Sequence, residues 1–151
     1  MKLKHKFASL LLFTAVSCAS GATYSEIEHR IPEIPTGEGR IIFYRDASMF
    51  GAAVQPAVSL DEQEVGESVP GGFFFVDRPA GKFRANCSTE VDRQVSFTLA
   101  EQQVRYIRGT VSMGFWAGHV NLEMVDPNEA KPGLGDLSYT GLNDLLKPET
   151  E

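Results

Sequence analysis

The 151-residue chain is long enough for one domain with a real core, and its 14 basic and 20 acidic residues give a net charge of −6. A net acidic chain without a lysine or arginine cluster is a poor binder of nucleic acid and of anionic lipid headgroups. The two cysteines, Cys18 and Cys87, are too few for a disulfide framework.

The first 17 residues have the pattern of an export signal. Residues 1–6 contain three lysines, residues 7–16 are apolar, and small residues follow. A membrane-spanning helix needs about 20 apolar residues, so this run is too short to remain in a bilayer. Removal of residues 1–17 leaves 11 basic and 20 acidic residues, a net charge of −9.

The end of this segment resembles the lipobox of bacterial lipoproteins. In such signals a short run of small residues ends in the cysteine that receives a diacylglyceryl group, and here Ala15, Val16 and Ser17 precede Cys18. A thiolate is the nucleophile that such a transfer needs. Ala15 departs from the usual leucine, and an ordinary signal-peptidase cut after Ala22 is the alternative, which would discard Cys18.

The resemblance implies attachment to a membrane through N-terminal acyl chains. One acyl chain alone is a marginal anchor, whereas three hold a protein essentially permanently. The residue after the cysteine is Ala19 rather than an aspartate. In bacteria with the usual sorting rule, this resembles the signal for delivery to the outer membrane. We therefore expect an outer-membrane lipoprotein that faces the periplasm, or a soluble periplasmic or secreted protein after an ordinary cut.

Composition divides the chain into four segments. These are the signal (1–17), a lipidated cysteine with a flexible tether (18–38), a β domain (39–126) and a C-terminal tail (127–151). The tether is expected because its residues are small and polar and its prolines favour an extended course. In the tail, residues 132–135 (Pro-Gly-Leu-Gly) are expected to break any element. Only residues 140–147 could form a short helix, either capping the domain or docking a partner.

Short apolar runs separated by turn residues predict about eight β-strands in the domain. We expect them at residues 40–45, 54–60, 63–67, 73–76, 82–88, 92–99, 104–112 and 120–125. Three successive phenylalanines at 73–75 cannot share one face, so we expect that strand to be covered on both sides. The pattern predicts an all-β antiparallel β-sandwich of immunoglobulin-like or transthyretin-like type, with a barrel as the alternative.

No group of residues has a spacing that predicts catalysis. The two histidines outside the signal, His29 and His119, have no neighbouring ligands at zinc-site spacing, and no Gly-x-Ser-x-Gly elbow is present. The acidic residues around Asp61 lie at an expected hairpin tip, where water leaves carboxylates too acidic for general acid catalysis. Cys87 fits a small buried hydrophobe. We expect no enzymatic activity, no cofactor and no metal.

Two loops carry large aromatic residues that could bind a ligand or a partner. Phe115 and Trp116 stand between two glycines, with His119 close behind, and Phe50 lies in the loop after the first strand. Aromatic residues on such loops serve as binding anchors. They also fold back as core plugs, which is the interpretation we favour for both loops.

The domain resembles the bacterial lipoprotein family known only as domain-of-unknown-function family 2846. The matching residues are 42–45 (Ile-Phe-Tyr-Arg), Phe50, Gly51, Val54, Pro56, 58–61 (Val-Ser-Leu-Asp), Val65, Gly66, 71–74 (Gly-Gly-Phe-Phe), 79–82 (Pro-Ala-Gly-Lys), 111–114 (Val-Ser-Met-Gly) and Gly118. The resemblance implies an all-β envelope domain without assigned catalytic residues. The leading hypothesis is a lipid-anchored, non-catalytic binding or structural module with an envelope protein partner. The alternatives are a soluble carrier of a small ligand and an enzyme.

Overall fold

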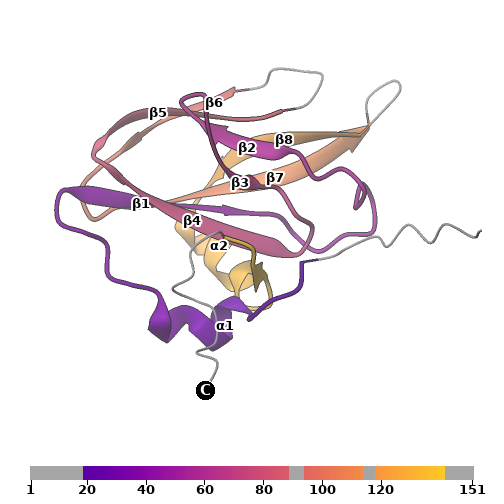
Figure 1. Cartoon of the computed structure of the whole chain (residues 1–151), viewed down its shortest axis with the longest axis horizontal. Helices are drawn as coiled ribbons and strands as arrows, with labels where there is room; N and C mark the ends of the chain where they lie inside the picture. The colour runs from indigo at the N-terminus through magenta and orange to yellow at the C-terminus, as the bar shows by residue number, and fades with distance from the viewer. Residues whose placement is uncertain (1–18, 89–93, 114–117, 142–151) are drawn as a thin grey trace, which may run out of the picture.

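The computed structural model describes residues 19–88, 94–113 and 118–141, which form two facing β-sheets with helices on one side (Figure 1). The first sheet has the order β8-β7-β1-β4-β9, made of Gly118–Val125, Val104–Met113, Glu38–Tyr44, Gly72–Pro79 and Ser138–Tyr139. The second has the order β3-β2-β5-β6, made of Gln63–Glu67, Ala57–Leu60, Gly81–Cys87 and Gln94–Leu99. The mostly β, sandwich-like architecture confirms that part of the prediction, and the immunoglobulin-like or transthyretin-like type stays a prediction.

The expectation of a purely antiparallel sandwich is wrong. Strand β1 runs parallel to β7, with Arg40 opposite Val104, and β4 runs parallel to β9, with Gly72 opposite Ser138. Parallel neighbours need long crossover connections. After β1 the chain forms β2 and β3 of the second sheet, β4 on one side of β1, and β5 and β6 of the second sheet. It then returns as β7 on the other side of β1, so the parallel pair joins segments far apart in sequence.

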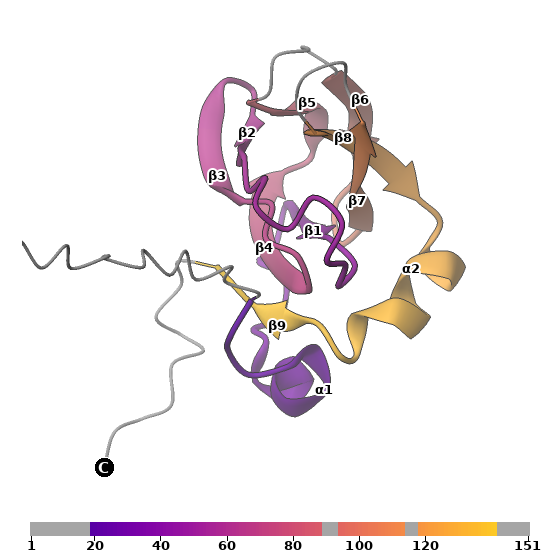
Figure 2. The same cartoon turned by 90° about the vertical axis from the view of Figure 1, so that its right-hand side faces the viewer.

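Strand β1 is buried on both faces. Ile41 and Phe43 point into the core between the sheets, whereas Ile42 and Tyr44 point into a second core on the outer face of the first sheet. That second core is closed by residues of the helices α1 (Tyr24–Ile27) and α2 (Pro127–Leu134), which cover this face in Figure 2. The fold therefore has three layers: the second sheet, the first sheet and the helices.

The prediction that the phenylalanine-rich strand is covered on both sides is confirmed. In β4, Phe74 faces the inner core, where its ring stacks on Phe43 with a centroid separation of 5.0 Å. Phe73 and Phe75 face the outer core, and all three phenylalanines of the run are buried. In β5, Ala85 and Cys87 are likewise buried on one face, as the alternation predicted.

The first hairpin also lies where the sequence placed it. Asp61 and Glu62 connect β2 to β3 with φ values of 48° and 69°. Two successive positive φ angles are those of a type I′ turn, whose twist matches that of paired strands. The Asp61 carboxylate also accepts a hydrogen bond from the backbone N–H of Arg84 at 2.9 Å, which ties the turn to β5.

The segment before β1 differs from the expected flexible tether. Residues Tyr24–Ile27 form α1, a short 3₁₀ helix follows at Glu28–Arg30, and Ile27 is buried in the outer core. The Tyr139 N–H donates to the Ala22 carbonyl at 2.9 Å. A four-residue helix has no detectable periodicity, and its stability depends on covering the outer face of β4, which the sequence alone does not show.

The C-terminal segment also differs from expectation, because a helix runs through Pro132. Asp126 caps α2 by accepting from the Asn128 N–H at 2.8 Å, and Ala130 and Leu134 are buried against the sheet. Pro132 removes one backbone hydrogen bond of the helix and crowds the carbonyl four residues earlier, and burial of Ala130 and Leu134 offsets that cost. Of the helix expected at 140–147, residues 140 and 141 are not helical, and 142–147 lie outside the described residues.

A nearly buried ion pair joins the two central strands on their outer face. The Arg40 guanidinium donates two hydrogen bonds of 2.7 Å to the Asp77 carboxylate, and it lies 4.4 Å from the centroid of the Phe75 ring. The side chains of Arg40 and Asp77 are 7% and 18% exposed. Loss of one partner would leave the other charge desolvated without compensation.

We expect Asp77→Ala to lower the free energy of unfolding by about 3 kcal/mol, because Arg40 would remain buried without its counter-ion. Urea denaturation followed by circular dichroism measures this change. The matched control is Glu123→Ala, which breaks the Arg108–Glu123 pair, where the Glu123 side chain is 45% exposed. Its cost should stay below about 1 kcal/mol. Equal costs for the two variants would contradict a special role for the buried pair.

Candidate functional site

The candidate site is the end of the sandwich where β1 leads into β2 through residues 46–56. Arg45, directly after β1, is only 2% exposed and organises this connection. Its guanidinium donates to the carbonyls of Val54 at 2.6 Å, Gly51 at 2.8 Å and Ser68 at 3.1 Å. One side chain thus fixes two points of the loop and the segment that leads into β4.

Arg45 is a buried cation held by carbonyl dipoles. Within the described ranges it forms no salt bridge with a carboxylate. Burial lowers the pKa of Arg45 from its ordinary value, and the Cys87 thiol is a smaller influence in the opposite direction. Sequence reasoning missed this role, although a signal was present, because Arg45 continues the inward alternation of Ile41 and Phe43.

The loop that Arg45 holds lies against β7 and turns its large apolar side chains outward. Gly51 has a φ of +68°, and a Cβ there would lie 2.6 Å from Val111 Cγ1, so no other residue fits without a shift. Met49 is 80% exposed and Phe50 52%. The core-plug expectation for Phe50 is therefore wrong: the tight turn at Gly51 packs against Val111, and the Phe50 side chain stays half exposed at the groove beside β7.

Of the four residues of the predicted aromatic site, the structure describes Phe50 and His119 and does not place them in one groove. Phe115 and Trp116 lie outside the described residues. His119 lies on β8 opposite Ser112 and is half-buried. The groove beside Phe50 has a volume of about 190 Å³ and is lined by residues of the loop and of β7, and His119 is not among them. Met113, at the end of β7, is an exposed residue that the sequence analysis did not select.

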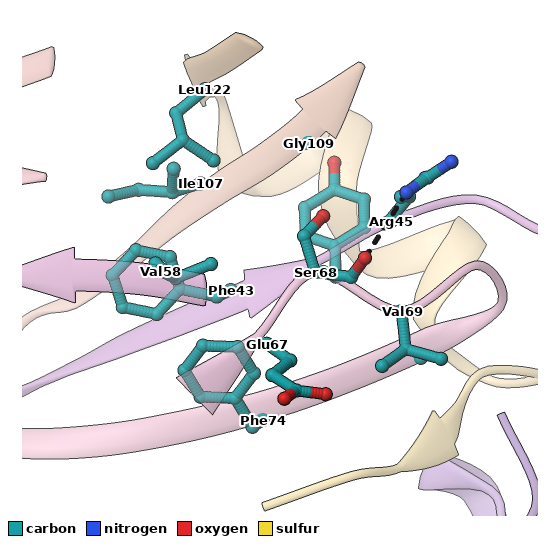
Figure 3. A pocket seen from close by; sticks show the side chains of 12 residues that line it. Phe43, Arg45, Val58, Glu67, Ser68, Val69, Phe74, Ile107, Gly109 and Leu122 are labelled. Carbon is teal, nitrogen blue, oxygen red and sulfur yellow. Dashed lines mark hydrogen bonds between the residues drawn. The ribbon is translucent and has the colours of Figure 1, made fainter. Parts of the chain in front are cut away.

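A small internal cavity adjoins Arg45 (Figure 3). It lies between Phe43, Phe74 and Ser68, and the figure shows the Ser68 carbonyl accepting a hydrogen bond from the guanidinium. Its volume is about 10 Å³. A cavity of this size holds at most one water molecule. It is a packing defect beside a buried charge and not a ligand site.

The remaining chemistry-bearing residues are dispersed. Among the described residues, no three histidine, cysteine or acidic side chains are grouped as metal ligands would be. Cys87 is a free, buried cysteine, as the sequence predicted, and burial raises the pKa of its thiol to about 12. No helix in the described part of the chain is long and apolar enough to cross a membrane.

Comparison with known protein families shows which family this domain resembles. The model of the family described as "Protein of unknown function (DUF2846)" matches residues 35–121, from the approach to β1 into β8. The chain belongs to the DUF2846 family. The match confirms the resemblance to this domain family, while the lipoprotein character stays a prediction, and it includes Arg45, the 46–56 connection and Gly51. The segments that form α1, α2 and β9 fall outside it.

One curated relative is an uncharacterized protein of Haemophilus influenzae. It is 30% identical over 112 residues, which cover 74% of this chain and 65% of the relative. The match therefore covers less than two-thirds of that protein's length. No solved structure matches the chain.

Replacement of Arg45 by methionine should leave three carbonyls without their donor and lower the free energy of unfolding by about 2–4 kcal/mol. Hydrogen exchange should also accelerate at the amides of Ala52 and Val54, which close the turns of this loop. Denaturant titration and exchange mass spectrometry measure the two effects.

The control for that variant is Arg105→Met, which removes one exposed hydrogen bond to the Thr98 carbonyl. It should change stability by less than about 1 kcal/mol. If both arginine variants behave alike, water replaces the Arg45 donors and the loop does not depend on them.

The Cys87 thiol should be almost inert in the folded chain. With Cys18 replaced by serine, Cys87 is the remaining cysteine, and at pH 8 its reaction with N-ethylmaleimide should be about 1000-fold slower in the folded than in the urea-unfolded state. The reason is that burial both raises its pKa to about 12 and blocks access. Mass spectrometry follows the adduct, and similar rates in the two states would refute the burial.

Proposed function

We propose that this protein is a lipid-anchored protein of the bacterial envelope, held by acyl chains on Cys18. Its β-sandwich acts as a non-catalytic binding or structural module. The sequence supports the anchor through its short apolar signal and the lipobox-like run that ends in Cys18. Ala19 after the cysteine favours delivery to the outer membrane, with the domain facing the periplasm.

The observation that carries this proposal is the packing of residues 19–22. The Ala19 N–H donates to the Pro70 carbonyl at 3.1 Å, and the Ala22 carbonyl accepts from the Tyr139 N–H at 2.9 Å. A Cβ on Gly21 would lie 2.8 Å from the Tyr139 carbonyl oxygen, so this segment passes close to β9. A cut after Ala22 would remove all these contacts, whereas a cut before Cys18 keeps them. The packing therefore favours the lipoprotein cleavage site.

A binding or structural role for the domain agrees better with the geometry than either alternative. Small-molecule pockets usually measure about 300–1,000 Å³, whereas the groove beside Phe50 measures about 190 Å³. At the Phe50 site this favours a surface contact over a small-ligand pocket, although an open hollow over β5 and β6, lined by Phe83 and Phe97, measures about 420 Å³. Cys87 does not support the enzyme hypothesis as a catalytic nucleophile, because its thiol is buried and the raised pKa of that thiol disfavours the thiolate.

Metabolic labelling with palmitate tests the anchor. The full-length protein should incorporate the label and float with membranes, whereas Cys18→Ser should lose the label, because the hydroxyl does not replace the thiolate as lipid acceptor. Globomycin, which blocks the lipoprotein signal peptidase, should cause the precursor to accumulate. Mass spectrometry of the mature N-terminus then identifies the acylated residue.

Cys87→Ala is the matched control, since it removes the other cysteine and should retain both the label and the membrane association. A soluble, unlabelled mature chain that begins at Thr23 would refute the proposal and establish the ordinary signal-peptidase cut.

A further inference from the structure

The position of Ala19 determines where the proposed anchor would leave the domain. Its N–H is bonded to the Pro70 carbonyl, and a Cβ on Gly72 would lie 3.2 Å from the Ala19 Cβ. Cys18 is joined to Ala19 by one peptide bond, and consecutive Cα atoms are about 3.8 Å apart. Acyl chains on Cys18 would therefore be one residue removed from the surface formed by residues 70–72.

The loop that carries Met49 and Phe50 begins next to the same residues. The Gly71 N–H donates to the Arg45 carbonyl and the Arg45 N–H donates to the Gly72 carbonyl, both at 3.0 Å. A Cβ on Gly71 would lie 3.4 Å from the Ala47 Cβ. Met49 follows Ala47 by two residues. The anchor point and the exposed tip of the loop therefore belong to one continuous surface.

Exposed apolar side chains concentrate at this end of the sandwich. In Figure 1 the start of the described chain (indigo) and the connection between β1 and β2 (purple) lie toward the same right-hand end. Met49, Phe50 and Met113, at the tip of the β7–β8 hairpin, are three of the four large hydrophobic residues that are exposed in the described ranges. The fourth, Met124, lies six residues beyond Gly118 on β8, about 20 Å farther along the strand.

We infer that this end of the sandwich rests on the bilayer that holds Cys18 and that Met49 and Phe50 insert into its interface, an inference that rests on the proposed lipid anchor. The net charge of −9 after signal removal gives no attraction to anionic headgroups, so the contact is apolar. Attachment at Cys18 keeps the loop at high effective concentration beside the lipid, so insertion of only Met49 and Phe50 suffices to hold this end of the domain on the bilayer.

Methionine oxidation tests this orientation without a label or a substitution at Met49. Hydrogen peroxide oxidises methionine according to its exposure, and peptide mass spectrometry reports each site separately. The lipidated chain is reconstituted into vesicles of phosphatidylethanolamine and phosphatidylglycerol, and the Cys18→Ser chain in solution is the reference. Met124, at the far end of β8, is the internal control.

In vesicles the oxidation rate of Met49 relative to Met124 should fall about fivefold or more, because the interface excludes water from an inserted side chain. The ratio should not change between low and high salt, since no charge attraction is involved. Phe50→Asp should restore Met49 oxidation, because a charge opposes insertion, whereas Glu62→Gln in the β2–β3 turn should leave the ratio unchanged.

Unchanged Met49 oxidation in a chain that carries its acyl groups would overturn the inference and leave the anchor intact. Protection of Met49 in isolated envelopes but not in pure lipid vesicles would overturn it in favour of a protein partner on this surface. Absence of acyl groups on Cys18 would overturn the proposed function together with the inference.

Discussion

The burial of β1 on both faces is the constraint on which the rest of this structure depends. Ile41 and Phe43 require one apolar layer, and Ile42 and Tyr44 require another on the opposite side. A backbone buried in this way must also pair along both edges, and β4 and β7 supply those bonds. The second sheet covers one face, and segments from before β1 and after β8 cover the other.

The outer face of the first sheet is covered by segments from near both ends of the described chain, so packing of the outer core determines where those segments lie. Since α1 packs on the outer face and β9 pairs with β4 at the edge of the first sheet, the residues that precede α1 lie against the domain at Gly21 and Ala22. The point from which an N-terminal anchor would leave is thus a consequence of core packing. At this same end of β1, Arg45 places a cation on the inner face of the strand, and its carbonyl partners shape the loop between the two sheets.

The candidate site was only partly accessible from the sequence. The loop containing Phe50 was selected because an aromatic residue next to glycine is a common binding element. Its exposure could not be predicted, because it depends on the contact of Gly51 with Val111, sixty residues away. The same holds for Met113 and for the partners of Arg45, which depend on how loops and strands from different parts of the chain meet.

The sequence by itself determined strands β1 to β8, the first hairpin, the double burial of residues 73–75, the burial of Cys87 and the family. These follow from local alternation, turn chemistry and motif order, which need no knowledge of distant partners. Only the tertiary structure decided the parallel pairing of β1 with β7 and the docking of α1, α2 and β9. The physical reason is that short helices and edge strands gain their stability from the surface they cover, and that surface exists only once the sheets have assembled.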